Sequence, residues 1–400
     1  MRTAARALLL LFVFAIPWEY SLDFGAPWGN VARLAGLALL AVAIPAILQA
    51  GRVRALGTLQ WASILLFAYL GATYLWSIEP EVTLGRLPGY LQELMIVWLV
   101  GELIDSKDDL HNLFRAWLAG CAVLAGLTLS SAVLALRGAE QVRFFAAGQD
   151  PNDTARFLAL GLPIAALLAD RSVMQWKRRI SLLYIPLGVI AILATASRGG
   201  FLTMLVSLVG CGVLMARTRR FRVLHMLVPL LAIVAAALFM IPRNSLLRIA
   251  SIAEQANGGD LNQRVNIWQE GWNAFQRAPL LGHGAGTFVA ASGLSSIDTA
   301  HNTALSVLVE GGILGLAIGA GIFVCSIAMA RSLKGALQIA LLAMLAAWTV
   351  ASLVGTTGES RTTWLLFAVI ATAARQHRSS ALVNVKPQTS ASLQSAGAGA

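Results

Sequence analysis

The stretch that decides the fold is ISLLYIPLGVIAILATASRGGFLTMLVSLVGCGVLMA, residues 180–216. Its only formally charged side chain is Arg198, which lies in Ser197-Arg198-Gly199-Gly200 between two apolar runs. A helix that crosses the hydrocarbon core of a bilayer needs roughly 20 apolar residues, and each run approaches this length. We therefore expect two membrane-spanning helices that are joined by a tight turn at Arg198.

The whole chain of 400 residues has the same character, with 58% hydrophobic and 12% charged residues. Soluble domains carry about 25% charged residues, so the composition excludes a soluble globular protein. The three cysteines lie in apolar runs, which excludes a secreted disulfide scaffold. The net charge of +11 comes from dispersed basic residues, a pattern that argues against nucleic-acid binding. The prediction is an all-α, polytopic integral membrane protein.

Apolar runs of sufficient or nearly sufficient length predict about twelve transmembrane helices. They are 4–20, 34–51, 55–78, 87–104, 116–136, 154–169, 180–197, 199–216, 223–242, 311–330, 335–358 and 362–374. The first run lacks a small-residue cleavage site, so we expect a retained anchor rather than a secretory signal. We assign residues 1–375 to one transmembrane domain that includes a long polar loop, 243–300. The Ser-, Ala- and Gly-rich tail, 376–400, is predicted to be disordered.

The basic residues predict the orientation, because cytoplasmic loops of membrane proteins are enriched in Lys and Arg. With the N-terminus in the cytoplasm, all four lysines (Lys107, Lys177, Lys334 and Lys386) fall on the inner side. Both termini are then cytoplasmic, and loop 243–300 faces outward. Within this loop, Val265, Trp268, Trp272 and Phe275 recur at helical spacing and predict an amphipathic helix.

Several arginines and one histidine are predicted to gather at the outer ends of the spans. Arg198 marks the turn, His301 precedes the tenth span, and Arg264 lies on the amphipathic helix. Arg143 and Arg156 flank Gln149-Asp150-Pro151-Asn152-Asp153, which is also a typical turn and helix N-cap. Arginine binds phosphate oxygens bidentately, and histidine accepts protons near neutral pH. This set suits group transfer from a lipid-linked pyrophosphate, although each residue alone also fits a structural role.

The other candidate sites are weaker. Gly282-His283-Gly284-Ala285-Gly286 is not a dinucleotide fingerprint, so His283 is interpreted as a loop residue. Glu310 either orients the His301 imidazole or faces a cavity. The histidines are scattered over both faces and predict no metal site; Glu19 and Asp23 in the first outer loop are the alternative for a divalent ion.

Two segments together resemble a known family. APLLGHGAGTF (278–288), followed by HNTALSVLVEGGILGL (301–316), is similar to bacterial inner-membrane glycosyltransferases of the O-antigen ligase and polymerase superfamily. Ser197-Arg198-Gly199-Gly200 also matches the family pattern, whereas Gln149-Asp150 departs from it.

The resemblance implies an O-antigen ligase with a large periplasmic loop and a periplasmic active site. Such an enzyme moves a glycan from undecaprenyl pyrophosphate to a sugar of lipid A–core, without a metal or nucleotide cofactor. By the same resemblance, His301 would be the catalytic base, and Arg198 and Arg264 would hold the donor pyrophosphate. Arg143, Arg156 and Arg361 are added to the donor site by topology alone.

Three alternatives remain open. An O-antigen polymerase would use another lipid-linked repeat as the acceptor, and a protein O-oligosaccharyltransferase would use a protein. A transporter or flippase of an anionic lipid would also need basic cavities, but it predicts mid-membrane charges and a two-fold repeat, neither of which is evident.

Overall fold

The computed structural model describes residues 1–25, 28–135, 143–171, 174–217, 243–251, 263–295 and 299–385. Its first half comprises α1 (Arg2–Ala15), the 3-10 helix η1 (Ile16–Ser21), α2 (Val31–Gln49), α3 (Thr58–Ala72), the 3-10 turn η2 (Thr73–Leu75), α4 (Pro80–Leu103), α5 (Lys107–Ala135) and α6 (Pro151–Arg171). The second half comprises α7 (Gln175–Ala194), α8 (Arg198–Arg217), α10 (Arg243–Ala250), α12 (Arg264–Arg277), α13 (Phe288–Ser292), α14 (Thr303–Ser332), α15 (Gly335–Leu353) and α16 (Arg361–Val385). The prediction of an all-helical protein is confirmed for this part of the chain.

Seven of these helices are long and apolar enough to cross a membrane. They are Arg2–Ser21, Val31–Gln49, Thr58–Leu75, Lys107–Leu134, Arg198–Arg217, Thr303–Ser332 and Gly335–Leu353. Four further predicted spans coincide with α4, α6, α7 and α16, which are helical but carry more polar residues. The predicted span 223–242 lies outside the described residues. The structure thus supports a polytopic helical protein, and the count of twelve stays a prediction.

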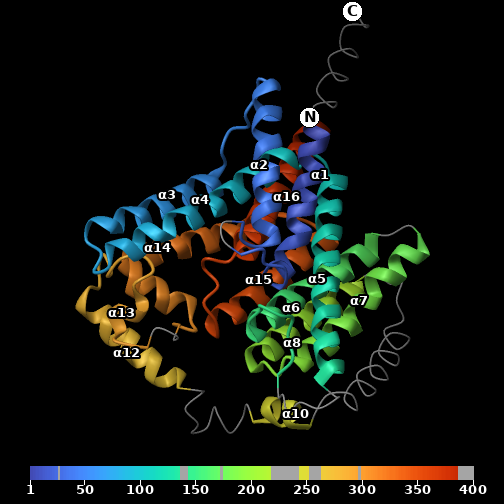
Figure 1. Ribbon diagram of the computed structural model, residues 1–400. Helices are drawn as coiled ribbons and strands as arrows, with labels where there is room; N and C mark the ends of the chain where they lie inside the picture. Colours follow the sequence, from blue (N-terminus) through green and yellow to red (C-terminus); the bar gives the residue numbers. More distant parts are fainter. Residues whose placement is uncertain are drawn as a thin grey trace, which may run out of the picture.

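The helices form two groups that meet at α15 (Figure 1). On one side α5, α6, α7 and α8 pack together, and on the other α3, α4 and α14 run side by side. Helix α15 contacts α6 and α8 in the first group and α14 in the second. Helix α15 therefore lies between the two groups.

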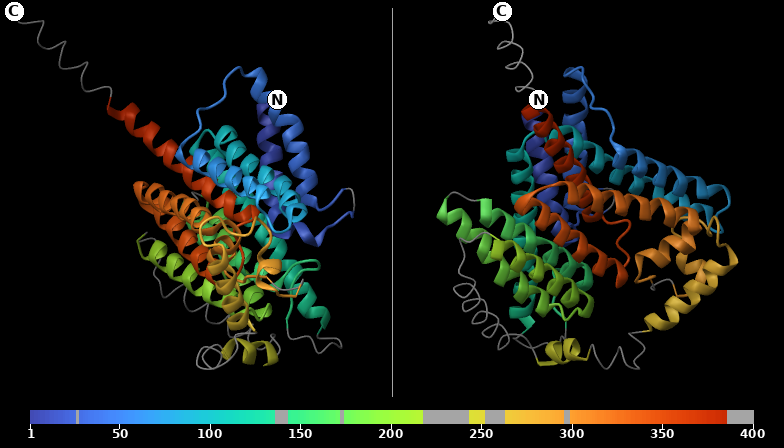
Figure 2. Two further views of the ribbon diagram at one scale, coloured as in Figure 1. Left: turned by 90° about the vertical axis from the view of Figure 1, so that its left-hand side faces the viewer. Right: turned by 180° about the vertical axis from the view of Figure 1, so that it is seen from behind.

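The N-terminus and the far end of α16 lie at the same end of the molecule, whereas α10, α12 and α13 lie at the opposite end (Figure 2). We call the latter the loop end. Helix α16 continues to Val385, so residues 376–385 of the predicted disordered tail are helical, and the rest of that tail lies outside the described residues. The side chain of Gln376 donates to the Ser106 carbonyl at 3.2 Å, and the Ser379 hydroxyl donates to the Arg375 carbonyl at 3.1 Å. These hydrogen bonds help to hold the first of the additional turns.

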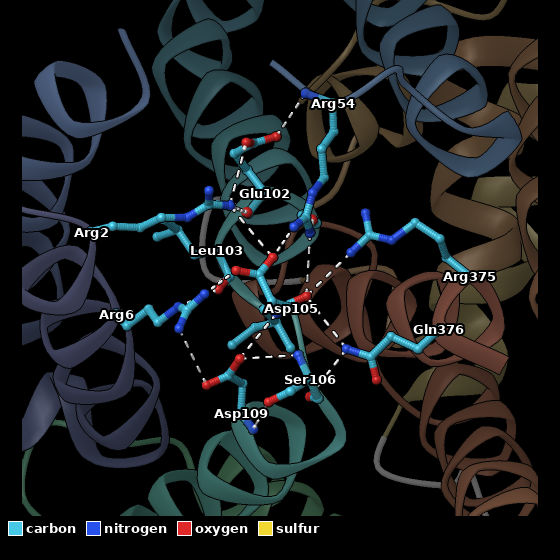
Figure 3. A network of polar contacts seen from close by, with 12 residues as sticks. Arg2, Arg6, Arg54, Glu102, Leu103, Asp105, Ser106, Asp109, Arg375 and Gln376 are labelled. Atoms are coloured by element: carbon cyan, nitrogen blue, oxygen red, sulfur yellow. Dashed lines mark hydrogen bonds and ion pairs between the residues drawn. The ribbon is translucent and has the colours of Figure 1, made fainter. Parts of the chain in front are cut away.

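A network of charged side chains ties four segments together at the end that carries the N-terminus (Figure 3). Asp105, between α4 and α5, forms ion pairs with Arg6 of α1 and Arg54 of the 50–57 loop. The carboxylate of Glu102 accepts the amide of Arg54 at 3.0 Å, and Arg375 of α16 donates to the carbonyl of Ile104 at 3.2 Å. These contacts fix the ends of helices that are far apart in the sequence.

Replacing Asp105 with Asn is expected to destabilise the fold by about 1–3 kcal/mol, because the guanidinium groups of Arg2, Arg6 and Arg54 all lose an ion pair with this carboxylate. The measurement is the thermal unfolding midpoint of the purified protein. Asp108→Asn, an exposed change in the first turn of α5, is the matched control. Equal midpoints for the two variants would contradict a structural role for the network.

Candidate active site

The turn between α7 and α8 anchors the first part of the site. Ala196 adopts a positive φ of 49°, which reverses the chain, and the Ser197 hydroxyl accepts the amide of Gly200 at 3.0 Å at the start of α8. A side chain at Gly200 would come within 2.2 Å of Ala155, so the two helices approach closely only with glycine there. Arg198 therefore begins α8 in a fixed position, and the predicted tight turn is confirmed.

Residues 143–152 pack directly on this turn. The Arg143 guanidinium donates to the Thr195 carbonyl at 3.3 Å and to the side-chain oxygen of Asn152 at 3.0 Å. The Ser197 hydroxyl donates to the same oxygen at 2.8 Å. Asp150 accepts the amides of Asn152 and Asp153, which confirms the predicted helix N-cap of α6. Asn152 was not predicted as a site residue, yet it joins Arg143 to the Arg198 turn.

Arg198 points to α10 at the loop end. Its guanidinium donates at 3.0 Å to the carbonyl of Arg248 and at 3.0 Å to the hydroxyl of Ser251. Arg248 was not predicted as a site residue, because the sequence around it carries no recognisable motif. The contact brings a fourth arginine next to Arg143, Arg198 and Arg264.

The electrostatics show that these four arginines share one environment. Burial, followed by the positive charge of Arg248, lowers the pKa of Arg143 to about 10, and Arg264 and Arg198 contribute in the same direction. Burial and Arg198 likewise lower the pKa of Arg264. Asp150 opposes both shifts. We call Arg143, Arg198, Arg248 and Arg264 the arginine cluster. Since a pKa of about 10 leaves Arg143 protonated at neutral pH, the cluster concentrates positive charge and favours an anion.

Helix α12 confirms the predicted amphipathic helix and links Arg264 to His301. Trp268 and Phe275 pack on a small apolar core with α13 and α14, whereas Val265 and Trp272 are exposed. The indole of Trp268 donates to the carbonyl of Ala300 at 3.0 Å, directly before His301. Arg264 precedes Trp268 by four residues and therefore lies on the same helix face.

His301 occupies a constrained position before α14. Its φ of 46° is unusual for a residue with a side chain, and Nδ1 lies 3.2 Å from the hydroxyl of Thr299. Asn302 then caps α14 by accepting the amide of Leu305 at 3.0 Å. The helix thus begins at Thr303, ahead of the predicted span 311–330, and His301 is held at its entrance.

Residues 353–357, at the C-terminal end of α15, lie against the residues next to His301 and next to Arg198. On one side Asn302 donates to the Leu353 carbonyl at 3.4 Å, and the Thr303 hydroxyl donates to the Gly355 carbonyl at 2.9 Å. On the other side, a side chain at Gly199 would lie 2.6 Å from Val354. The residues that directly follow His301 and Arg198 therefore lie against the same short segment, although they come from different helix groups.

Arg156 and Arg361, which were added to the donor site by topology, have carboxylate partners. Arg156 forms an ion pair with Asp153 at 3.1 Å. Arg361 pairs with Glu19 and also donates to Gln92 at 2.8 Å. These partners offset both charges, so the arginine cluster is the better anion site. The pairing also occupies Glu19, one of the two carboxylates considered for a divalent ion.

No group of three His, Cys, Asp or Glu side chains within the described ranges could hold a metal ion.

The glycine-rich loop 278–288 fills a break in α14. Gly312 has φ 63° and ψ −165°, which interrupts the helix. The amide of Ile313 donates to the Pro279 carbonyl at 2.9 Å, and the amides of His283 and Gly284 donate to the carbonyls of Val309 and Glu310 at 2.9 and 3.0 Å. The backbone groups left by the break are thus satisfied by the loop, as burial in a membrane protein requires.

The side chains of His283 and Glu310 secure the same loop. His283 Nε2 lies 2.8 Å from the Ala274 carbonyl of α12, in keeping with its interpretation as a loop residue. The Glu310 carboxylate accepts the Gly286 amide at 2.9 Å and the Ser306 hydroxyl at 3.1 Å. Glu310 also lines a cavity, which is one of the two roles considered for it.

Replacing Gly282 with Ala is expected to reduce stability by at least about 2 kcal/mol. Its φ of 70° disfavours a side chain, and the new Cβ would lie 2.4 Å from the Glu310 carbonyl oxygen. Gly321→Ala, in the same α14 but with no atom within 4 Å of its Cβ position, is the control. Thermal unfolding and the yield of monodisperse protein measure both; a Gly282 variant as stable as the control would refute the packing argument.

Comparison with known proteins now adds to this geometry. Residues 180–320 match the family described as O-antigen ligase. The matched range holds Arg198, Arg248, Arg264, the glycine-rich loop and His301. Arg143 precedes it. No curated protein matches the chain.

Proposed function

Because residues 180–320 make the chain a member of the O-antigen ligase and polymerase superfamily, we propose that it is an O-antigen ligase. It moves a glycan from undecaprenyl pyrophosphate to a sugar hydroxyl of lipid A–core. The proposed location is the bacterial inner membrane, with both termini cytoplasmic and the loop end in the periplasm. The observation that supports this proposal is that Asn302, next to His301, and Gly199, next to Arg198, both lie against the same segment, residues 353–357.

The arginine cluster is the proposed site of the donor pyrophosphate. Arg143 and Arg198 are held by carbonyl, amide and hydroxyl oxygens in the described contacts, so their guanidinium groups are positioned in advance. Fixed cations that face a departing diphosphate stabilise the charge that develops on it in the transition state. A single donor of this kind contributes about 2.7–4 kcal/mol in a well-studied case.

His301 is the proposed general base. When its Nδ1–H donates to the Thr299 hydroxyl, Nε2 carries the lone pair that accepts a proton. The acceptor hydroxyl oxygen attacks the anomeric carbon, and its proton passes to the imidazole. The bond from that carbon to the pyrophosphate oxygen breaks, and the electron pair leaves with the pyrophosphate. General-base catalysis supplies about 10²–10⁴-fold, so the cations and the alignment of substrates supply the rest.

Deletion of the gene, followed by lipopolysaccharide gel electrophoresis and analysis of the carrier lipid, tests the proposal. Loss of the ligase removes long chains from lipid A–core while they accumulate on undecaprenyl pyrophosphate. A single repeat that stays attached to the core would instead identify a polymerase. Unchanged lipopolysaccharide and altered glycoproteins would identify a protein O-oligosaccharyltransferase. Either result would overturn the proposed acceptor.

A further inference from the structure

A cavity of about 590 Å³ lies beside the proposed catalytic base, among α3, α4, α13, α14, α15 and α16. Thr299, Ala300 and Thr303 line it, so it reaches the segment that carries His301. Its volume falls within the usual range of small-molecule sites, about 300–1,000 Å³. The arginine cluster does not contribute to its walls.

One end of the cavity is polar and holds two carboxyl groups and one guanidinium group. Glu359 forms an ion pair with Arg86 at 2.7 Å and accepts the Tyr90 hydroxyl at 3.1 Å. Glu310 adds a second carboxylate, which is bound by an amide and a hydroxyl rather than by a cation. The guanidinium of Arg86 is already paired with Glu359, so this end favours an uncharged group over an anion.

The Glu359 carboxylate is fixed by its contacts but remains partly accessible. Its side chain is 38% exposed, and that of Arg86 is 45% exposed, whereas Tyr90 is only 4% exposed. A carboxylate has about four acceptor positions, and the two described contacts leave room for further donors. Hydroxyl groups are uncharged donors that fit this arrangement.

Aromatic rings form much of the remaining wall. Trp348 and Trp364 both line the cavity, and each packs against the ring of Phe367, at centroid distances of 5.3 and 5.7 Å. Their indole N–H groups already donate to Thr363 and Gly358, so the rings present apolar surface. Sugar rings combine apolar C–H faces with hydroxyl edges, and they match a cavity with aromatic walls and a carboxylate end.

We propose that this cavity binds the uncharged sugar of the acceptor, and that Glu359 accepts hydrogen bonds from its hydroxyl groups. The inference rests on the proposed function and divides the site into two halves. The arginine cluster takes the anionic donor group on one side of residues 353–357, and the cavity takes the neutral acceptor on the other. His301 lies where the two halves meet.

Binding is tested on the full chain in nanodiscs with radiolabelled octyl β-D-glucopyranoside as the probe, below its micellar concentration. Counts on empty nanodiscs are subtracted, and octyl phosphate serves as an anionic competitor of equal chain length. We expect saturable glucoside binding, weak competition by octyl phosphate, and about tenfold weaker binding in Glu359→Gln. Glu81→Gln, an exposed change in the first turn of α4, is the matched control.

Absence of saturable binding, equal competition by octyl phosphate, or unchanged binding in Glu359→Gln would each overturn the inference. Thermal unfolding checks that Glu359→Gln is folded, and Tyr90→Phe, which removes only one contact to Glu359, gives a second test with a smaller loss. In a transfer assay, Glu359→Gln should raise the KM for lipid A–core and leave that for the donor unchanged. If wild-type protein binds the glucoside but transfers no glycan, the proposed function fails and the sugar site stands.

Discussion

His301→Ala is expected to abolish glycan attachment to lipid A–core, with transfer reduced by about 10²–10⁴-fold. The imidazole is the only proposed proton acceptor, and alanine leaves the attacking hydroxyl without one. The measurement is the rate of transfer from a lipid-linked glycan to lipid A–core in proteoliposomes, together with the lipopolysaccharide pattern of cells that carry the variant.

The control must show that the variant still folds, because His301 has a positive φ and precedes the α14 cap. His301→Asn is suited to this, since asparagine tolerates that backbone conformation but is not a base. His283→Asn changes the other histidine of the loop end, whose ring contacts the Ala274 carbonyl, and should retain transfer if the protein remains folded. Transfer at the wild-type rate in His301→Asn would end the assignment of His301 as the base.

Removing two charges of the arginine cluster is expected to have the second large effect. Arg198→Gln combined with Arg264→Gln should lower transfer by at least about 10²-fold, since each stabilising donor is worth several kcal/mol when charge develops. Both arginines lie within the matched range 180–320, and they influence each other's charge environment. The measurement is the kcat/KM for the lipid-linked donor.

Arg217→Gln is the matched control, because Arg217 lies in the last turn of the same helix that Arg198 begins. The double variant should also lose affinity for inorganic pyrophosphate added as an inhibitor, whereas the control keeps it. If donor kinetics and pyrophosphate inhibition were both unchanged in the double variant, the cluster would not be the donor site.

Much of the fold could be predicted because hydropathy sets the position of helices in a membrane protein. Eleven of the twelve predicted spans coincide with described helices, and residue 198 lies at the turn between two of them. The predicted span begins at residue 311, whereas α14 begins at Thr303. The first turns were missed because Thr303–Gly311 includes Glu310 and is less apolar than the rest of the helix. The helical continuation of α16 to Val385 was also missed, because its polar sequence gives no apolar period.

The site was harder to predict, because its contacts join residues that are distant in the sequence. His301, Arg198 and Arg264 were predicted as site residues from local motifs and from their place at the ends of spans. Arg156 and Arg361 have similar local settings, but only the structure shows their partners, Asp153 and Glu19. The cavity and Glu359 gave no signal in the sequence, since the cavity walls come from six separate helices of the described chain.

The exchange of backbone hydrogen bonds between loop 278–288 and the break at Gly312 restricts how this protein can change in length. An insertion of one residue between Leu280 and His283 would move the loop groups on its two sides out of register with their partners on α14. Chimeras with relatives should therefore work only when the loop and the start of α14 are transplanted together. By the same reasoning, tags and fluorescent reporters belong elsewhere, for example after Val385.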